Sequence, residues 1–494
     1  MASLEDLLKK NYRVSWCAIS AFLILALLVP ALNAQTDRPL GNSPLSSGVL
    51  AARAFRAGLL HPETGTLPEE GFPASLSCPT APCVFPNVLA SEGGQPVNED
   101  PVAVNPKNPL QILTGGNDYN CGNIQGFYAT GDSGTTWTHT CYPGSGGEGD
   151  PVVGYDLNSV AYAGGIQNGD YVLSSSTDNG TTWSTPVVVS KPLLGYLADK
   201  PWLEIDTNGS SPLKNVLYVS GTQFASNSDS EISVSHSTDG GKTWTTKVVD
   251  TKQIYPNQVD QFSDLAIGAD GTVYVSWLRC PATTGDCGDT VASILLSKST
   301  DGGNTWSAPV TVTTVTLVPN ACGGGFYGCL PNTNERVSNI ASNAVHGSGS
   351  TAQVYLCVYN WTGSQMQVEV IKSTDGGTTW GAPVLVSTST KGDQFFQWIN
   401  LAKSGQVAVT WLDRRNDASN LKYQPFYTVS INGSTYGANH PLSTTMSNPN
   451  NDGFGGTFMG DYRTHVWNGS AIDAVWMDTR TNVSQDEAGG ALIK

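Results

Sequence analysis

Short apolar runs recur along this chain, and clusters of turn residues separate them. Residues 171–173, 232–234 and 294–296 are rich in Val, Leu, Ile and Tyr, and Asp and Gly follow each run closely. Runs of this length and composition, bounded by turn residues, predict β-strands joined by tight turns. We therefore predict an all-β fold.

One eight-residue pattern, Ser/Thr-x-Asp-x-Gly-x-Thr-Trp, occurs five times. The copies lie at residues 130–137, 176–183, 237–244, 299–306 and 373–380. The short Asp side chain accepts hydrogen bonds from nearby backbone N–H groups, Gly provides the positive φ of a tight turn, and Trp covers the turn with apolar surface. Because β-patterned runs precede the last four copies and follow most of them, we expect each copy to join two antiparallel strands.

A longer unit of about fifty to seventy residues contains these copies. Each unit begins with a strand, here called strand A, that starts near an acidic residue, and strands B, C and D follow. The starts of strand A are at Asp100, Asp150, Asp199, Asp264, residues 337–340, Asp393 and Asp461. Seven such units predict a β-propeller of four-stranded blades, with six blades as the alternative. We expect residues 84–89 to supply the last blade's fourth strand and so to close the ring.

The repeated pattern resembles the Asp-box, or bacterial neuraminidase repeat, of a superfamily whose best-known members are sialidases built as β-propellers. The resemblance covers most of the chain and implies a propeller in which the boxes are structural and lie on the face away from the active site. Two features depart from the sialidase pattern. Sialidases have six blades, and they typically open with an Arg-Ile-Pro motif that this chain lacks.

Composition narrows the range of partners. The 494 residues include 39% hydrophobic residues, 54 Gly and 28 Pro, which suits a large core built from many short strands. With 25 basic and 41 acidic residues the net charge is −16, so we expect no nucleic-acid partner, because phosphate binding needs a basic surface. Nothing after the N-terminal apolar run is long enough to span a bilayer, so we expect no membrane contact after signal cleavage.

The N-terminal part of the chain predicts export. Basic residues precede an apolar run at 16–29, and a small-residue cleavage site ends at Ala34, so residues 1–34 are interpreted as a signal peptide, with an uncleaved membrane anchor as the alternative. Residues 35–83 are rich in Pro, Gly and Ser, and we interpret them as a leader or linker, with one short helix at 49–60, packed loosely on a propeller of residues 84–494. The protein is predicted to be secreted or periplasmic, and monomeric.

The cysteines agree with export. After Cys17 they fall into close pairs, and four local disulfides suit an oxidising compartment. Cys357 is left over in an apolar run, where we expect a buried free thiol. The expected pairs are Cys78 with Cys83, Cys121 with Cys141, Cys280 with Cys287 and Cys322 with Cys329.

Arginines gather at one predicted face. In an antiparallel blade the start of strand A and the end of strand B lie on one face, and the repeated turns lie on the other. Guanidinium groups bind carboxylates and sulfates with two hydrogen bonds, so this rim is predicted to hold an anionic sugar. The predicted substrate-binding residues are Arg279, Arg414, Arg415, Arg463 and Arg480.

Three residues are candidates for catalysis of glycoside cleavage, which commonly uses paired acids. The resemblance implies a nucleophilic Tyr, for which Tyr462 is the candidate, and an acid/base, for which Asp100 or Glu99 is the candidate. Asp413 is the third, because its surroundings occur once and break the repeat. The alternative is that the repeated acids pair across blades or cap loop N–H groups and serve the architecture.

No cofactor is predicted. The six histidines show no zinc-binding spacing, and no loop has the regular oxygen ligands of a calcium site, although the acids on one face leave room for calcium. The sequence is compatible with three functions. The first is an exported, sialidase-like glycoside hydrolase acting on glycans. The second is a non-catalytic propeller that binds a polysaccharide or protein ligand in the cell envelope or outside the cell, and the third is a structural protein of the cell envelope.

Overall fold

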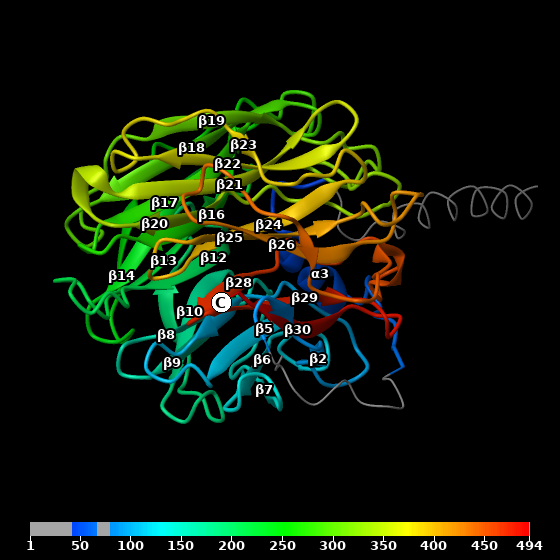
Figure 1. The fold of residues 1–494 in the computed structure, drawn as a ribbon, viewed down its shortest axis with the longest axis horizontal. Helices are drawn as coiled ribbons and strands as arrows, with labels where there is room; N and C mark the ends of the chain where they lie inside the picture. Colours follow the sequence, from blue (N-terminus) through cyan, green and yellow to red (C-terminus); the bar gives the residue numbers. More distant parts are fainter. Residues whose placement is uncertain (1–41, 67–79, 494) are drawn as a thin grey trace, which may run out of the picture.

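Seven antiparallel sheets surround a central axis (Figure 1). Five sheets have four strands, and the sheets of blades one and seven have five because one of the four strand positions is divided between two short strands. The structure, a computed structural model, describes residues 42–66 and 80–493. The prediction of a seven-bladed β-propeller is confirmed. The predicted signal peptide and Cys78 lie outside the described residues.

The strands follow one another from the axis outward in every blade. Blade one contains β3 (Val97–Asn98), β4 (Val102–Val104), β5 (Ile112–Asp118), β6 (Gly126–Thr130) and β7 (Thr138–Cys141). Blade two contains β8 (Val152–Tyr155), β9 (Ala161–Gln167), β10 (Asp170–Ser176) and β11 (Val187–Ser190). Blade three contains β12 (Leu197–Ile205), β13 (Leu217–Phe224), β14 (Ser230–Ser237) and β15 (Thr245–Val248). Blade four contains β16 (Val259–Ile267), β17 (Val273–Cys280), β18 (Val291–Ser299) and β19 (Val310–Thr316).

The remaining blades have the same order. Blade five contains β20 (Ser342–His346), β21 (Gln353–Trp361), β22 (Met366–Ser373) and β23 (Val384–Leu385). Blade six contains β24 (Gln394–Leu401), β25 (Val407–Asp413), β26 (Gln424–Ser430) and β27 (His440–Pro441). Blade seven contains β28 (His465–Asn468), β29 (Ala471–Asp478), β30 (Gln485–Leu492) and two short strands from the other end of the propeller, β1 (Cys83–Val84) and β2 (Val88–Leu89).

The ring closes by β-pairing between the two ends of the propeller. In the outer part of blade seven, Cys83 pairs with Leu492 and Val88 pairs with Ala488. Figure 1 shows the result, with red β30 beside blue β2. The predicted closure by residues 84–89 is confirmed, and it explains why blade seven has no turn between its third and fourth strands.

The five repeated patterns are turns between the third and fourth strands of blades one to five, as predicted. In blade three, Asp239 Oδ1 accepts hydrogen bonds from the backbone N–H groups of Lys242 and Thr243, both at 3.0 Å, and Oδ2 accepts one from Thr243 Oγ1 at 2.6 Å. Gly241 N donates to Ser237 Oγ at 2.9 Å. The Trp of each turn is half-buried against the blade.

Blade six contains a shorter version of this turn that the pattern did not reveal. Between β26 and β27, Gly433 N donates to Ser430 Oγ at 2.8 Å, and Ser434 N donates to Asn432 Oδ1 at 2.9 Å. Asn432 therefore stands where the other turns have Asp, and Tyr436 stands in place of Trp. One residue is missing as well, so the turn did not match the eight-residue pattern.

Several inner strands begin with an irregularity at the same place. In five blades, one residue near the start of the inner strand has a positive φ, between 48° and 66°. These residues are Glu99, Asp150, Lys200, Phe262 and Phe396. In β12, β16 and β24 this residue lies where the pairing with the second strand of the blade shifts in register. Such bulges change the direction of the side chains that follow. Two positions further on in these three strands, the side chains line a cavity on the propeller axis.

Three of the expected disulfides are confirmed: Cys121–Cys141, Cys280–Cys287 and Cys322–Cys329. Cys357 is free and buried, as predicted. Within the described ranges, no helix has the length and apolar character needed to cross a lipid bilayer.

Candidate functional site

Helix α3 (Ser47–Arg56) covers the face on which the starts of the inner strands lie (Figure 1). Its first turn meets the propeller's acids directly. Ser46 N donates to Asp199 Oδ2 at 2.8 Å, and Ser47 donates to Asp461 through its backbone N at 2.7 Å and its Oγ at 3.0 Å. Because the first N–H groups of a helix lack partners within the helix, carboxylates are favourable neighbours for them.

The rest of this segment is also fixed to the propeller. Arg336 Nη1 donates to the carbonyl oxygen of Leu45, and both Arg53 and Arg56 form ion pairs with Glu148, at 3.0 Å and 2.8 Å. Most residues of the helix are buried. For residues 45–56, the expectation of loose packing on the propeller is therefore wrong. The predicted helix exists, but it spans Ser47–Arg56 instead of 49–60.

A buried group of acids lies beneath the helix. Burial, and then the nearby carboxylate of Asp461, raise the pKa of Glu99 to about 7. Burial, and then Asp150, raise the pKa of Asp199 to about 7 as well. Lys200 lies among these acids, and burial lowers the pKa of its amine. The helix thus covers a group of carboxyls that are easily protonated near neutral pH.

The structure places two of the three predicted catalytic residues close together. Asp100 and Tyr462 lie at the junction of blades one and seven, where Asp100 N donates to the carbonyl oxygen of Tyr462 at 3.3 Å. Asp100 is buried, and burial together with Asp486 raises its pKa. The Tyr462 hydroxyl donates to the carbonyl oxygen of Pro151 at 2.7 Å.

Asp413 lies elsewhere, on blade six. Its Oδ2 accepts hydrogen bonds from Trp411 Nε1 and Arg415 Nη2, both at 2.6 Å, and its Oδ1 accepts one from Arg415 N at 2.8 Å. A carboxylate with these contacts positions its own loop. No substrate role follows from them.

The predicted substrate-binding arginines lie on different blades, and each has an acidic neighbour. Arg279 on blade four binds Asp260 and Asp250, and Arg480 on blade seven binds Asp478 and Glu487. On blade six, Arg415 binds Asp413 at 2.6 Å, and buried Arg414 has Asp393 at 3.8 Å. Arg463 is buried beside Asp100 at the junction of blades one and seven. Their roles in binding an anionic sugar stay predictions.

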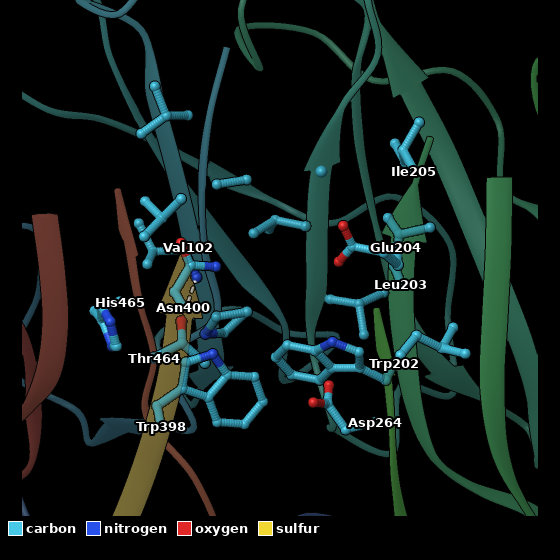
Figure 2. A pocket seen from close by; sticks show the side chains of 18 of the residues that line it. Val102, Trp202, Leu203, Glu204, Ile205, Asp264, Trp398, Asn400, Thr464 and His465 are labelled. Atoms are coloured by element: carbon cyan, nitrogen blue, oxygen red, sulfur yellow. Dashed lines mark hydrogen bonds between the residues drawn. The ribbon is translucent and has the colours of Figure 1, made fainter. Parts of the chain in front are cut away.

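A cavity of about 180 Å³ follows the second half of the inner strands along the axis (Figure 2). The part of its lining that β12 contributes begins at Trp202 and continues to Thr207, an exposed residue just beyond the end of this strand. Since strand A ends on the face that carries the repeated turns, the cavity approaches the face opposite to helix α3. The indole rings of Trp202 and Trp398 lie beside each other in it, with centroids 4.6 Å apart.

Two acids and a histidine line this cavity. Figure 2 shows the carboxylate of Glu204 pointing from β12 into the space above the two indole rings, with Asp264 on the other side of Trp202. Burial, and then the charges of Asp264 and Asp206, raise the pKa of Glu204 to about 8. Burial raises the pKa of Asp264 to about 7, and it lowers the pKa of His465 to about 3, so that the imidazole is neutral.

Two of these groups have an atom without a partner. Asp264 Oδ2 accepts a hydrogen bond from Asn343 N at 2.6 Å, but the buried Oδ1 has no hydrogen-bond partner. His465 Nδ1 lies 2.8 Å from Thr410 Oγ1, and the buried Nε2 has none. Buried polar atoms of this kind are costly unless something binds them.

The prediction of the site missed Trp202, Glu204 and Trp398. Asp264 was recognised only as the start of a strand. The sequence held a partial signal, because two of the inner strands have a Trp near their start. The positive-φ residue two positions before each Trp has no recognisable sequence pattern, so the sequence did not show that these Trp side chains point to the axis.

One group of potential metal ligands lies together within residues 42–66 and 80–493. It consists of Cys121, His139 and Cys141. The two cysteines form a disulfide, which leaves no thiolate for a metal. The prediction of no cofactor, with calcium left open, stays a prediction.

Comparison with known proteins finds likeness in fold alone. No family model matches the chain, and no curated protein matches it. Among solved structures, the intramolecular trans-sialidase of Ruminococcus gnavus is similar, with 13% identity, a TM-score of 0.42, and coverage of 65% of this chain and 90% of that one. The α-L-arabinanase of Penicillium chrysogenum has 12% identity and a TM-score of 0.42, with 69% of this chain and 92% of that one covered. An ulvan lyase has 9% identity and a TM-score of 0.47, with 82% and 96% covered.

Proposed function

We propose that this protein is an exported β-propeller that binds glycans, and that a sugar ring enters the axial cavity. The observation that supports this most directly is the pair of indole rings, Trp202 and Trp398, beside the carboxyl group of Glu204. Aromatic faces pack against the C–H face of a sugar ring, and a few polar groups then fix its hydroxyls. The three disulfides and the predicted signal peptide support export.

The size of the cavity suits one ring. Its volume of about 180 Å³ exceeds the roughly 150 Å³ of an engineered protein cavity that binds benzene. Polar partners for hydroxyl groups are available as well, since Asn343, Asn400 and Thr464 also line the cavity. A chain end or a single exposed residue of a polysaccharide is therefore the expected ligand.

Calorimetric titration of the exported protein with a panel of neutral, acidic and basic oligosaccharides tests this function. We expect Trp398→Phe to weaken binding about five-fold, which is about 1 kcal/mol, because it removes half of the indole face. Trp306→Phe is the matched control, since Trp306 belongs to a repeated turn on blade four. The function is refuted if no oligosaccharide binds or if the two variants bind equally well.

Glycoside hydrolysis is the second candidate function. Glu204 and Asp264 share the cavity, and both have a pKa near neutral, which suits proton transfer to a leaving group. A panel of chromogenic glycosides tests this activity, and Glu204→Gln should abolish any turnover found.

The monomeric state also stays a prediction.

A further inference from the structure

The described residues that line the axial cavity include no lysine or arginine. Their acidic side chains are Glu204 and Asp264, and His465 is neutral. An anionic sugar would therefore meet carboxyl groups in this cavity and no cationic lining residue. We propose that the sugar bound here is an amino sugar, whose protonated amine lies against Glu204 and the indole ring of Trp398. This inference rests on the proposed glycan binding at the same cavity.

Glu204 is the first group in the cavity that a bound cation would stabilise. It lies on β12 and has no hydrogen-bond or ion-pair partner among the described residues. Desolvation and the neighbouring acids make its ionised form unfavourable, as its raised pKa of about 8 indicates. A bound ammonium would remove this penalty, because an opposite charge within a few ångströms favours the ionised carboxylate.

Asp264 provides a second, independent reason. Its side chain is about 1% exposed, and Oδ1 lacks a hydrogen-bond donor, although Oδ2 is fixed by Asn343. An ammonium group has three donors, so it can donate to a carboxylate oxygen such as Oδ1 of Asp264. The hydroxyl groups of a neutral sugar supply donors too, but they carry no positive charge.

The aromatic rings favour a cation as well. The face of an indole ring carries negative potential and attracts an ammonium within about 6 Å of the ring. The chain itself uses this interaction nearby: Lys200 Nζ lies 5.0 Å from the centroid of Trp202 and 3.5 Å from that of Tyr462. Lys200 does not line the cavity, so the ring of Trp398 is left for a ligand.

The test compares three β-1,4-linked tetrasaccharides that differ only at carbon 2: those of glucosamine, N-acetylglucosamine and glucose. Calorimetry with the exported protein at pH 6 measures their affinities, where the free amine is charged and the acetylated nitrogen is not. We expect the glucosamine tetramer to bind at least ten-fold more tightly than the other two. Glu204→Gln should remove this preference, so that the three tetramers bind this variant alike.

Glu369→Gln is the matched control. Glu369 lies on β22, the third strand of blade five, and burial raises its pKa too, but it does not line the cavity. This variant should keep the full preference for the amine. The inference is overturned, and glycan binding survives, if the three tetramers bind alike or if Glu204→Gln keeps the preference. If none of them binds and the wider panel also fails, glycan binding itself is refuted.

Proton release gives a further readout. The charges that act on Glu204 are those of Asp264 and Asp206, and Tyr155 and His465 are the other titratable residues that line the cavity. Since Glu204 is protonated at pH 6 in the free protein, a bound cation should displace its proton, and the binding enthalpy should depend on the ionisation enthalpy of the buffer. Glu204→Gln should lose this dependence. A wild-type enthalpy that is equal in all buffers would contradict the proposed contact.

Discussion

The two faces of this propeller use the same acidic side chains in opposite environments. On the face that carries the repeated turns, Asp178, Asp239 and Asp301 are exposed, and hydrogen bonds from hydroxyl and backbone N–H groups lower the pKa of each to about 2. Beneath helix α3, burial raises the pKa of Glu99 and Asp199 to about 7. The difference shows that the number of donors and the access of water decide the charge of an acid here, and that the residue type does not.

The two environments also have different consequences for function. The turn acids are ionised at every physiological pH, and they hold a local loop. The acids under α3 change their charge near neutral pH, and they hold a segment that covers the face predicted from sequence to bind the ligand. The open cavity lies towards the other face. The comparison therefore separates structural acids from acids whose charge can be regulated.

The largest expected effect is on the pH dependence of stability. In the unfolded chain Glu99 and Asp199 lose their protons near pH 4, but in the folded protein they keep them to about pH 7. The folded state binds more protons in this window, so its stability falls as pH rises through it. Each group should contribute about 2 kcal/mol less at pH 8 than at pH 5.

Thermal unfolding at a series of pH values measures this effect. The wild type should unfold at a higher temperature at pH 5 than at pH 8, and the variant Glu99→Gln should show a weaker dependence. Asp178→Asn serves as the control from the opposite face, because its titration lies below this range. A wild-type unfolding temperature that rises steadily from pH 5 to pH 8 would contradict the assignment.

The second effect concerns the close approach of helix α3 to the buried acids. A Cβ added at Gly48 would lie 2.5 Å from Asp150 Oδ1 and 2.9 Å from Glu99 Oε2. Alanine normally favours a helix over glycine by about 1 kcal/mol. Here we expect Gly48→Ala to destabilise the protein by about 2 kcal/mol, because overpacking costs more than the gain in helix propensity.

Chemical denaturation and limited proteolysis near α3 test this variant. Gly209→Ala is the control, since Gly209 has open space around it. Gly48→Ala should unfold at a lower denaturant concentration and should be cleaved faster within residues 47–56. If it is more stable than the wild type, helix propensity dominates and the contact is not tight.

Most of the fold could be predicted because its signals are local. The repeated turns fix hairpins through residues within eight positions of one another, and the seven-fold repeat then sets the number of blades. The disulfides Cys280–Cys287 and Cys322–Cys329 join residues seven positions apart. Each of these features needs little knowledge of distant contacts.

The docking of α3 could not be predicted for the opposite reason. Ser46 and Ser47 bind Asp199 and Asp461, which are 153 and 414 positions away. The segment is short and consists mainly of small residues, so its sequence does not indicate which residues of the propeller it contacts. A helix of this kind is recognised only once the blades have brought their acids together.

The arginines show a similar limit. Their number and positions in the sequence favoured a rim that binds an anion, but the sequence does not say which carboxylates are nearest. Arg480 reaches Glu487 because β29 and β30 are neighbours, and Arg279 reaches Asp260 because β16 and β17 pair. The axial cavity is a property of the closed ring and of the bulges, so no single segment encodes it.

The smallest expected effect is at a single repeated turn. Asp239→Ala removes the acceptor for Lys242 N, Thr243 N and Thr243 Oγ1, and it should cost about 1 kcal/mol, as does the loss of a helix cap, because the exposed N–H groups can bind water instead. Thermal unfolding measures this cost. If Asp239→Ala also changed the slope of stability between pH 5 and pH 8, the charges on the two faces would be coupled, and the division between structural and titrating acids would have to be abandoned.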